Sequence, residues 1–297
     1  MANRKSYFII VFIVMASDLF CQENSLYLNS YISPFITNAA CTGSEYYPDV
    51  YFSVKKQWLG FPNSPSTYFI SGNIRLGQRD FYNSQGLLNK TPFNLSDRIR
   101  IGAAIFQDRN GPVTNTGGLL SYAYHVPLRN DESRLSFGLS AFIVNYAINS
   151  SILKSDQGDD YYLLNGPNNI IKLNFGFGIY YYTNNYYCGL SASKLLPGIS
   201  NAGEYIKMEQ SYFLMGGYKF KGDYNVTIFE PSIEIKKLPN ENLIFDTHAK
   251  FYVKKLNWLA ISYSTSKLLN IQFALQINRR TYIGYNYGYS MGPNCRL

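Results

Sequence analysis

Residues 170–187 read IIKLNFGFGIYYYTNNYY, and the alternation in this stretch decides the fold that the sequence predicts. Every second residue of the first part is apolar, namely Ile171, Leu173, Phe175, Phe177 and Ile179. The residues between them are polar or small, namely Lys172, Asn174, Gly176 and Gly178. Successive side chains of an extended strand point to opposite faces, so this pattern predicts a strand with one apolar face and one polar face.

The same two-residue period recurs along most of the chain. Runs of this kind cover residues 49–59, 66–76, 97–106, 134–146, 212–220, 243–253, 258–264, 270–278 and 282–289. Most of them have about 9–12 residues, which is the length that a tilted strand needs to cross a bilayer. The apolar faces of a soluble sandwich pack against each other, whereas those of a membrane barrel face lipid. A large secreted sandwich is the alternative fold.

Tyrosines gather where these runs end. The turn Thr183-Asn184-Asn185 is flanked on both sides by tyrosines, namely Tyr180, Tyr181, Tyr182, Tyr186 and Tyr187. Amphipathic aromatic rings are typical of the membrane–water interface, where they form girdles around membrane barrels. This position predicts an aromatic girdle and favours the membrane barrel over the sandwich.

The composition agrees with this fold. Aromatic residues make up 17% of the 297 residues and charged residues 15%, against roughly 25% charged residues in a typical soluble protein. After the N-terminal segment, no run approaches the roughly 20 apolar residues of a membrane helix. With about thirteen convincing runs, the sequence predicts an all-β fold: a transmembrane antiparallel β-barrel of about 14 strands, formed as a single domain by residues 22–297 after a short N-terminal segment.

The first 21 residues have the features of a signal peptide. Arg4 and Lys5 precede the short apolar run YFIIVFIVMA, which is followed by SDLFCQ. Cleavage after Cys21 would make Gln22 the first mature residue. A lipoprotein anchored at Cys21 is the alternative, although Asp18 and Phe20 occupy positions where a lipoprotein signal has small or aliphatic residues.

Neither nucleic-acid binding nor a catalytic motif is indicated. The formal charge is +8, but the basic residues are scattered, so we expect no nucleic-acid partner. His125 and His248 lie within strand patterns and are expected to face the lumen. The acidic run at residues 156–160 lacks the ligand spacing of a calcium loop. Glu230, Glu234 and Asp246 lie near strands without a pattern that pairs them as acid and base.

The remaining chemistry of the sequence is sparse as well. Cys41, Cys188 and Cys295 are too widely separated for a disulfide framework or a zinc site and are expected to be small apolar fillers. The zinc-protease, CxxC, nucleophile-elbow and phosphate-loop motifs are absent from the sequence. We therefore expect a protein that is not an enzyme and has no cofactor and no metal; an outer-membrane enzyme remains the least favoured class.

Several separated motifs resemble one family. They are the turn TNAACTGS at residues 37–44, the strand end Gln57-Trp58, the Pro65-Ser66-Thr67 entry to the next run, DRNGPVTNTGGLLSYAYHVPL at 108–128 and YYCGLSASKLLPG at 186–198. Together they resemble the PorP/SprF family of outer-membrane proteins from the type IX secretion and gliding-motility system of Bacteroidetes. Two departures stand out: Ala39 replaces the family's proline, and SMGPNCRL stands where members commonly carry a further strand with a His-Glu pair. We expect the last strand to be missing or irregular, with residues 22–35 as another source of a strand.

The resemblance implies a role and a set of partners. Members are thought to help secrete surface proteins, hold them at the outer membrane of Gram-negative Bacteroidetes and connect that membrane to periplasmic parts of the machine. The implied partners are outer-membrane lipid, the C-terminal domain of a secreted surface adhesin and periplasmic type IX secretion or gliding components. An outer-membrane channel or small-molecule transporter is the alternative function, but the bulky residues Phe142, Tyr146 and Tyr180 on the inward face favour a filled lumen.

The motifs supply the candidate structural and docking residues. They are Asn38, Gly43, Ser44, Gln57, Trp58, Pro65, Thr67, Gly111, Tyr122 and His125. Asn38, Gly43 and Ser44 are expected to form the turn, and Trp58 to anchor at the membrane interface. Gln57 and Thr67 are expected to hydrogen-bond the N-terminal segment to the barrel wall. Ordinary barrel packing is the alternative role for all of these residues.

Overall fold

The computed structural model describes residues 30, 32–45, 48–58, 60, 64–76, 98–128, 133–149, 169–195, 199–200, 210–222, 227–239, 241–253, 257–278 and 281–291. The predicted signal peptide, the acidic run at 156–160, Cys295 and the C-terminal residues 292–297 lie outside the described residues. The prediction of a missing or irregular last strand therefore stays a prediction.

Almost all described residues belong to one antiparallel sheet of 15 strands. The strands are β1 Asp49–Lys56, β2 Ser66–Arg75, β3 Ile99–Asn110, β4 Val113–Pro127, β5 Arg134–Ile148, β6 Asn169–Tyr182, β7 Tyr186–Ser193, β8 Ile199–Ser200, β9 Ser211–Tyr218, β10 Phe220–Lys221, β11 Thr227–Lys237, β12 Leu243–Val253, β13 Asn257–Ser264, β14 Leu268–Asn278 and β15 Thr281–Ser290. Their order in the sheet follows the sequence, except that the two-residue strands β8 and β10 pair with β6 and β11 beside the main path. The predicted all-β, antiparallel barrel architecture is confirmed.

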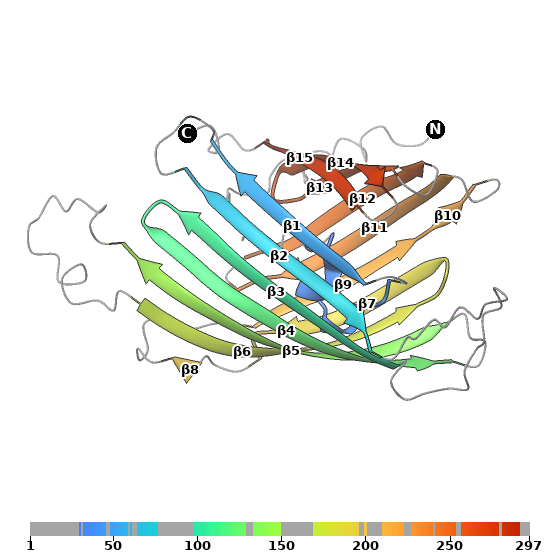
Figure 1. Ribbon diagram of the computed structural model, residues 1–297, viewed down its shortest axis with the longest axis horizontal. Helices are drawn as coiled ribbons and strands as arrows, with labels where there is room; N and C mark the ends of the chain where they lie inside the picture. Colours follow the sequence, from blue (N-terminus) through green and yellow to red (C-terminus); the bar gives the residue numbers. More distant parts are fainter. Residues whose placement is uncertain are drawn as a thin grey trace, which may run out of the picture.

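The sheet curls around an interior, with β1 to β6 on one side and β11 to β15 on the other (Figure 1). Long ladders hold the wall together: β4 and β5 pair without interruption from Val113 opposite Ile148 to Pro127 opposite Arg134. Between the described residues, no ladder joins β1 to β15. Nor do those residues include a helix that is long and apolar enough to span a membrane.

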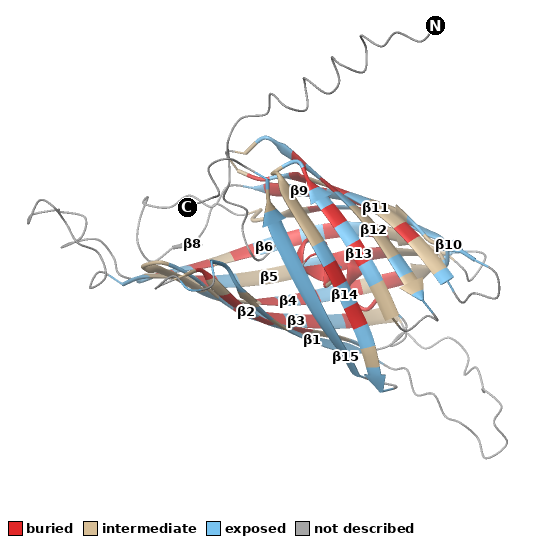
Figure 2. Cartoon of the chain, turned by 90° about the horizontal axis from the view of Figure 1, so that it is seen from above, coloured by how far each residue is buried: buried red, intermediate tan, exposed pale blue. Residues whose placement is uncertain are grey.

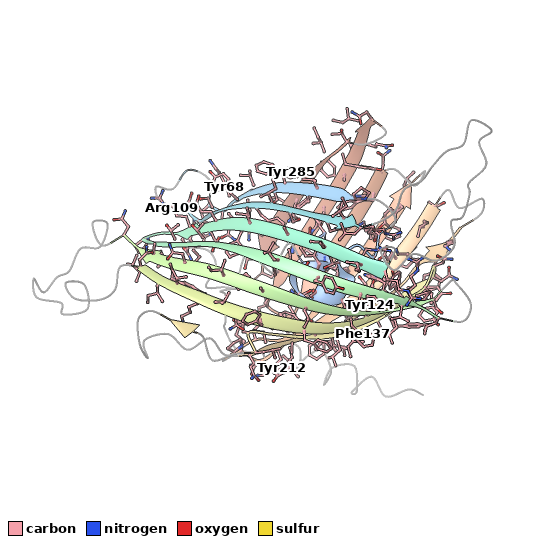
Figure 3. All side chains as sticks on the ribbon, turned by 60° about the horizontal axis from the view of Figure 1, so that its bottom comes forward. Tyr68, Arg109, Tyr124, Phe137, Tyr212 and Tyr285 are labelled. Atoms are coloured by element: carbon pink, nitrogen blue, oxygen red, sulfur yellow. The ribbon has the colours of Figure 1, made fainter. Side chains whose placement is uncertain are left out.

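The predicted two-residue alternation is confirmed in space. Lys172 and Asn174 of β6 are completely buried, whereas Ile171 before them and Phe175 after them are 42% and 40% exposed. The same alternation forms bands of buried and exposed residues across the strands (Figure 2). Aromatic side chains such as Tyr68, Phe137, Tyr212 and Tyr285 project from the outer surface (Figure 3). The outer face is therefore apolar, as the face that meets lipid must be.

The predicted girdle at the β6–β7 hairpin is only partly correct. Tyr186 is exposed and packs its ring against Tyr181. Tyr180, in contrast, is buried in the interior cluster, and Tyr182 and Tyr187 pack against that cluster. The reason is that the strand alternation continues through the tyrosine run, so neighbouring rings point to opposite faces.

Candidate functional site

The interior is filled by a segment of the chain itself. Residues 33–44, called the plug below, form two short 3-10 turns, η2 Pro34–Ile36 and η3 Ala39–Cys41, which lie inside the curled sheet (Figure 1). Phe35 is 2% exposed, and Ala40 is completely buried. They share one apolar cluster with wall residues Phe69, Ala104, Phe106, Leu119, Val144, Tyr180 and Met215. The plug and these wall residues together form a hydrophobic core inside the curled sheet.

The local sequence explains the shape of the plug. The side chain of Asn38 caps η3, because its Oδ1 accepts a hydrogen bond from the amide of Ala40 at 3.0 Å. Gly43 has a φ of 63°, in the left-handed region that glycine adopts at little cost. The amide of Ser44 then donates to the carbonyl of Cys41 at 3.1 Å. The prediction that Asn38, Gly43 and Ser44 form the turn is confirmed.

Glycines on the wall make room for the plug. A Cβ added at Gly138 of β5 would overlap the backbone of Ala39 and Ala40, and one added at Gly178 of β6 would overlap the amide of Asn38. At Gly102 of β3, a Cβ would stand 2.9 Å from Cγ2 of Thr42. The missing side chains therefore create a groove into which the plug backbone fits.

Hydrogen bonds join the plug to several strands. The side-chain amide of Asn38 donates to the carbonyl of Ile179 at 3.1 Å. The hydroxyl of Ser191 donates to the carbonyl of Thr37 at 2.7 Å. Two hydroxyl pairs also join plug and wall, Ser33 with Ser71 at 2.9 Å and Thr42 with Ser121 at 2.8 Å. These bonds satisfy buried backbone and side-chain groups that the lumen would otherwise leave without partners.

His125 holds the C-terminal end of the plug. Its side chain is 1% exposed, with Nε2 2.9 Å from the carbonyl of Thr42 and Nδ1 2.8 Å from the hydroxyl of Tyr182. A carbonyl oxygen only accepts, so Nε2 carries the proton; in the neutral ring, Nδ1 then accepts from Tyr182. The expected lumen-facing position of His125 is confirmed. Arg75 adds hydrogen bonds to the carbonyls of Gly43 and Ser44 at 3.2 and 3.3 Å.

The other predicted residues lie at one end of the sheet or on its outer surface. The amide of Gln57 donates to the carbonyl of Pro65 at 3.0 Å and closes the β1–β2 turn. The hydroxyl of Thr67 donates to Asp108 of β3 at 2.6 Å, in place of the expected bond to the N-terminal segment. Gly111, with a φ of 57°, makes the β3–β4 hairpin, and Tyr122 is 43% exposed.

Trp58 differs from the sequence prediction. The alternation places it on the outward face of a strand that continues to residue 59, but β1 ends at Lys56. Trp58 has a φ of 50° and is 52% exposed. This positive φ departs from the extended backbone of a strand, so the strand ends before the alternation does. Its proposed anchoring role stays a prediction.

Sequence reasoning missed most of the wall residues that bind the plug. Two of them, Ser71 and Arg75, lie outside the quoted family motifs. Two others, Ser121 and Ser191, lie within such motifs but were not singled out there as candidates. The signal that the sequence offers for these residues is the two-residue alternation, which places them on the inward face of their strands. Of the predicted cysteines, Cys41 is free and buried in the plug, where its thiol lies 3.6 Å from the sulfur of Met215. Cys188 is free and exposed.

An antiparallel sheet with an apolar outer face, a polar inner face and its own chain folded into the interior defines a transmembrane β-barrel with a filled lumen. The family model described as type IX secretion system membrane protein PorP/SprF matches residues 21–294. The chain therefore belongs to the PorP/SprF family, and the resemblance stated from its motifs is confirmed. A comparison with curated proteins finds no match.

Proposed function

We propose that this protein is an outer-membrane component of the type IX secretion system that docks secreted surface proteins and links them to periplasmic parts of the machine. The observation that carries the proposal is the family match over residues 21–294. The proposed role is one of binding and not of catalysis.

The filled lumen supports docking over the alternative of a channel. The plug is packed against an inner wall that includes β2, β3, β4, β5, β6 and β9 through the shared apolar cluster. A solute passing through this part of the lumen would have to displace buried groups such as Phe35 and Ala40. Partners are therefore expected at the ends of the barrel.

We propose that the end that carries Trp58 and Gly111 is the docking end for the secreted protein. Ser66 pairs with Arg109, which places the β1–β2 turn and the β3–β4 hairpin at the same end of the sheet. Trp58 is exposed there, and exposed aromatic side chains are frequent anchors of protein interfaces. Tyr186 is an exposed aromatic residue at the opposite end and serves as the comparison. Pro127, at the far end of β4, pairs with Arg134, and Arg134 pairs with Tyr182, which lies beside the β6–β7 hairpin that contains Tyr186.

The test is a pull-down with the detergent-purified protein and the C-terminal domain of a surface protein secreted by the same organism. Trp58→Ala is expected to weaken capture by about tenfold, which corresponds to about 1.4 kcal/mol. Tyr186→Ala, which removes an aromatic of similar exposure from the other end, is expected to leave capture unchanged. Equal loss in both variants would contradict the assignment of the end, and lack of capture by the unmodified protein would contradict the docking role.

A parallel measurement addresses the channel alternative. In planar bilayers the purified protein is expected to show no steady conductance. A large and stable conductance of the unmodified protein would overturn the proposal of a plugged docking platform.

A further inference from the structure

A cluster of ionisable side chains lies on the inner wall formed by β11 and β12. Glu234 and Asp246 stand directly opposite each other in the register of these two strands. Both are more than nine-tenths buried, with 6% and 5% of their surfaces exposed. Two like charges directly opposite in a sheet destabilise it, and burial adds the cost of desolvation. This pair therefore needs cations nearby.

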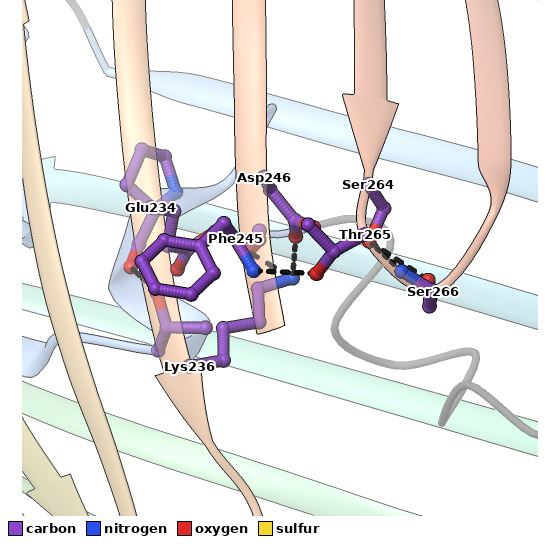
Figure 4. Close-up of polar contacts among 10 residues, drawn as sticks. Glu234, Lys236, Phe245, Asp246, Ser264, Thr265 and Ser266 are labelled. Carbon is purple, nitrogen blue, oxygen red and sulfur yellow. Dashed lines mark hydrogen bonds and ion pairs between the residues drawn. The ribbon is translucent and has the colours of Figure 1, made fainter. Parts of the chain in front are cut away.

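Lys236 supplies part of this charge (Figure 4). Its Nζ lies 2.6 Å from Oδ2 of Asp246 and 3.6 Å from Oε2 of Glu234. The hydroxyl of Ser30 donates to the same Oε2 at 3.0 Å. Among the described residues, this one ammonium is thus shared between the two carboxylates.

Among the residues that the structure describes, the two other carboxylate oxygens of the cluster have no hydrogen-bond partner. They are Oε1 of Glu234 and Oδ1 of Asp246, and both atoms are buried. A buried acceptor left without a donor costs roughly 1–3 kcal/mol, and more when it is charged. The structure thus contains two anionic oxygens that neither Lys236 nor Ser30 satisfies.

His248 completes a set of potential metal ligands. It follows Asp246 by two residues on β12, so both side chains belong to the same face of the strand. One ligand atom each from Glu234, Asp246 and His248 lies within 4.8 Å of the others. One imidazole nitrogen and two carboxylate oxygens form a donor set that Zn²⁺ accepts, with a fourth position left for water.

We propose that Glu234, Asp246 and His248 bind one zinc ion inside the barrel. The ion would place further positive charge beside the two carboxylates and give the two carboxylate oxygens a partner. The site would also stabilise the start of the described N-terminal segment, because Ser30 is bonded to Glu234. This inference does not depend on the proposed docking function.

The test uses the full mature chain in detergent, with any affinity tag removed and metal stripped by EDTA. Zinc is added and then dialysed, and the bound metal is measured by mass spectrometry. We expect one zinc ion per chain and a higher melting temperature in the presence of zinc. Glu234→Gln is expected to weaken zinc binding by about 100-fold.

Glu230→Gln is the matched control. Glu230 is a buried glutamate on the same strand and the same face, where it accepts hydrogen bonds from Tyr187 and Tyr252. This variant is expected to bind zinc as the unmodified chain does. Lack of zinc in the unmodified chain, or equal loss in both glutamine variants, would overturn the proposal.

Lys236→Met separates a metal site from a cluster of side-chain ion pairs. Removal of the ammonium lowers the melting temperature in either case. If zinc binds, its addition restores much of the loss, because it supplies positive charge to the same carboxylates. If the cluster depends on Lys236 alone, zinc leaves the melting temperature of this variant unchanged, and the proposal is refuted.

Discussion

Gly138 offers the most direct test of the plug. A Cβ at this position would stand 2.6 Å from the Cα of Ala40 and overlap the neighbouring backbone. Carbon atoms in contact are about 3.5–4.0 Å apart, so the plug would have to shift by about 1 Å. Overpacking of this kind costs about 1–3 kcal/mol. We expect Gly138→Ala to lower the free energy of unfolding by this amount.

The plug is expected to stay in place in this variant. Its withdrawal would expose Phe35 and Ile36, which are 2% and 7% exposed, and each buried apolar side chain of this size contributes about 1.5–3 kcal/mol. Withdrawal therefore costs more than the shift that alanine requires. Gly138→Leu adds too much volume for such a shift, and we expect it to expel the plug and to open the lumen.

Gly118 of β4 provides the control. A Cβ there would meet only the carbonyl of Ala104 at 3.6 Å and Cγ2 of Ile143 at 3.9 Å, which are ordinary contacts. Stability is measured by urea unfolding in detergent, and lumen opening by planar-bilayer conductance. If Gly138→Ala unfolds at the same urea concentration as Gly118→Ala, or if Gly138→Leu conducts no more than Gly118→Leu, the plug does not occupy the groove as described.

The remaining predictions concern Asn38 of the plug and His125 of the wall. Asn38→Ala removes the cap of η3 and the bond to Ile179, so we expect the free energy of unfolding to fall by about 1–2 kcal/mol in urea unfolding. His125→Phe leaves the buried carbonyl of Thr42 and the hydroxyl of Tyr182 without their bonds, and we expect a loss of about 2–4 kcal/mol by the same assay. Unchanged unfolding of either variant would show that its bonds do not stabilise the plug.

The sequence was informative wherever structure depends on near neighbours. The exposed Ile171 and the buried Lys172 follow from the two-residue period of a strand, which two adjacent residues already express. The turn at Asn38 and Gly43 follows from capping and from a left-handed φ, both of which act within a few residues. The family motifs are short contiguous stretches for the same reason.

The limits of sequence reasoning appear where strands end and where faces change. Trp58 was assigned to a strand because it continues the two-residue alternation of the preceding residues. In the structure, β1 ends at Lys56. Tyr182 and Tyr187 were grouped with the girdle tyrosines because they flank the same turn, but both pack against the interior cluster. At such positions the two-residue alternation and the end of the strand predict different places for a side chain. A single sequence does not say which of the two determines where the side chain lies.

The sequence by itself determined the class of this protein, because an apolar and a polar face repeat along each strand and several motifs of its family are contiguous. Only the tertiary structure decided what fills the lumen and which charges meet there. Asn38 bonds to Ile179, 141 residues away, and Ser30 to Glu234, 204 residues away. Such pairs arise from strand register and from the path of the plug, and both are properties of the whole curled sheet that no local pattern contains.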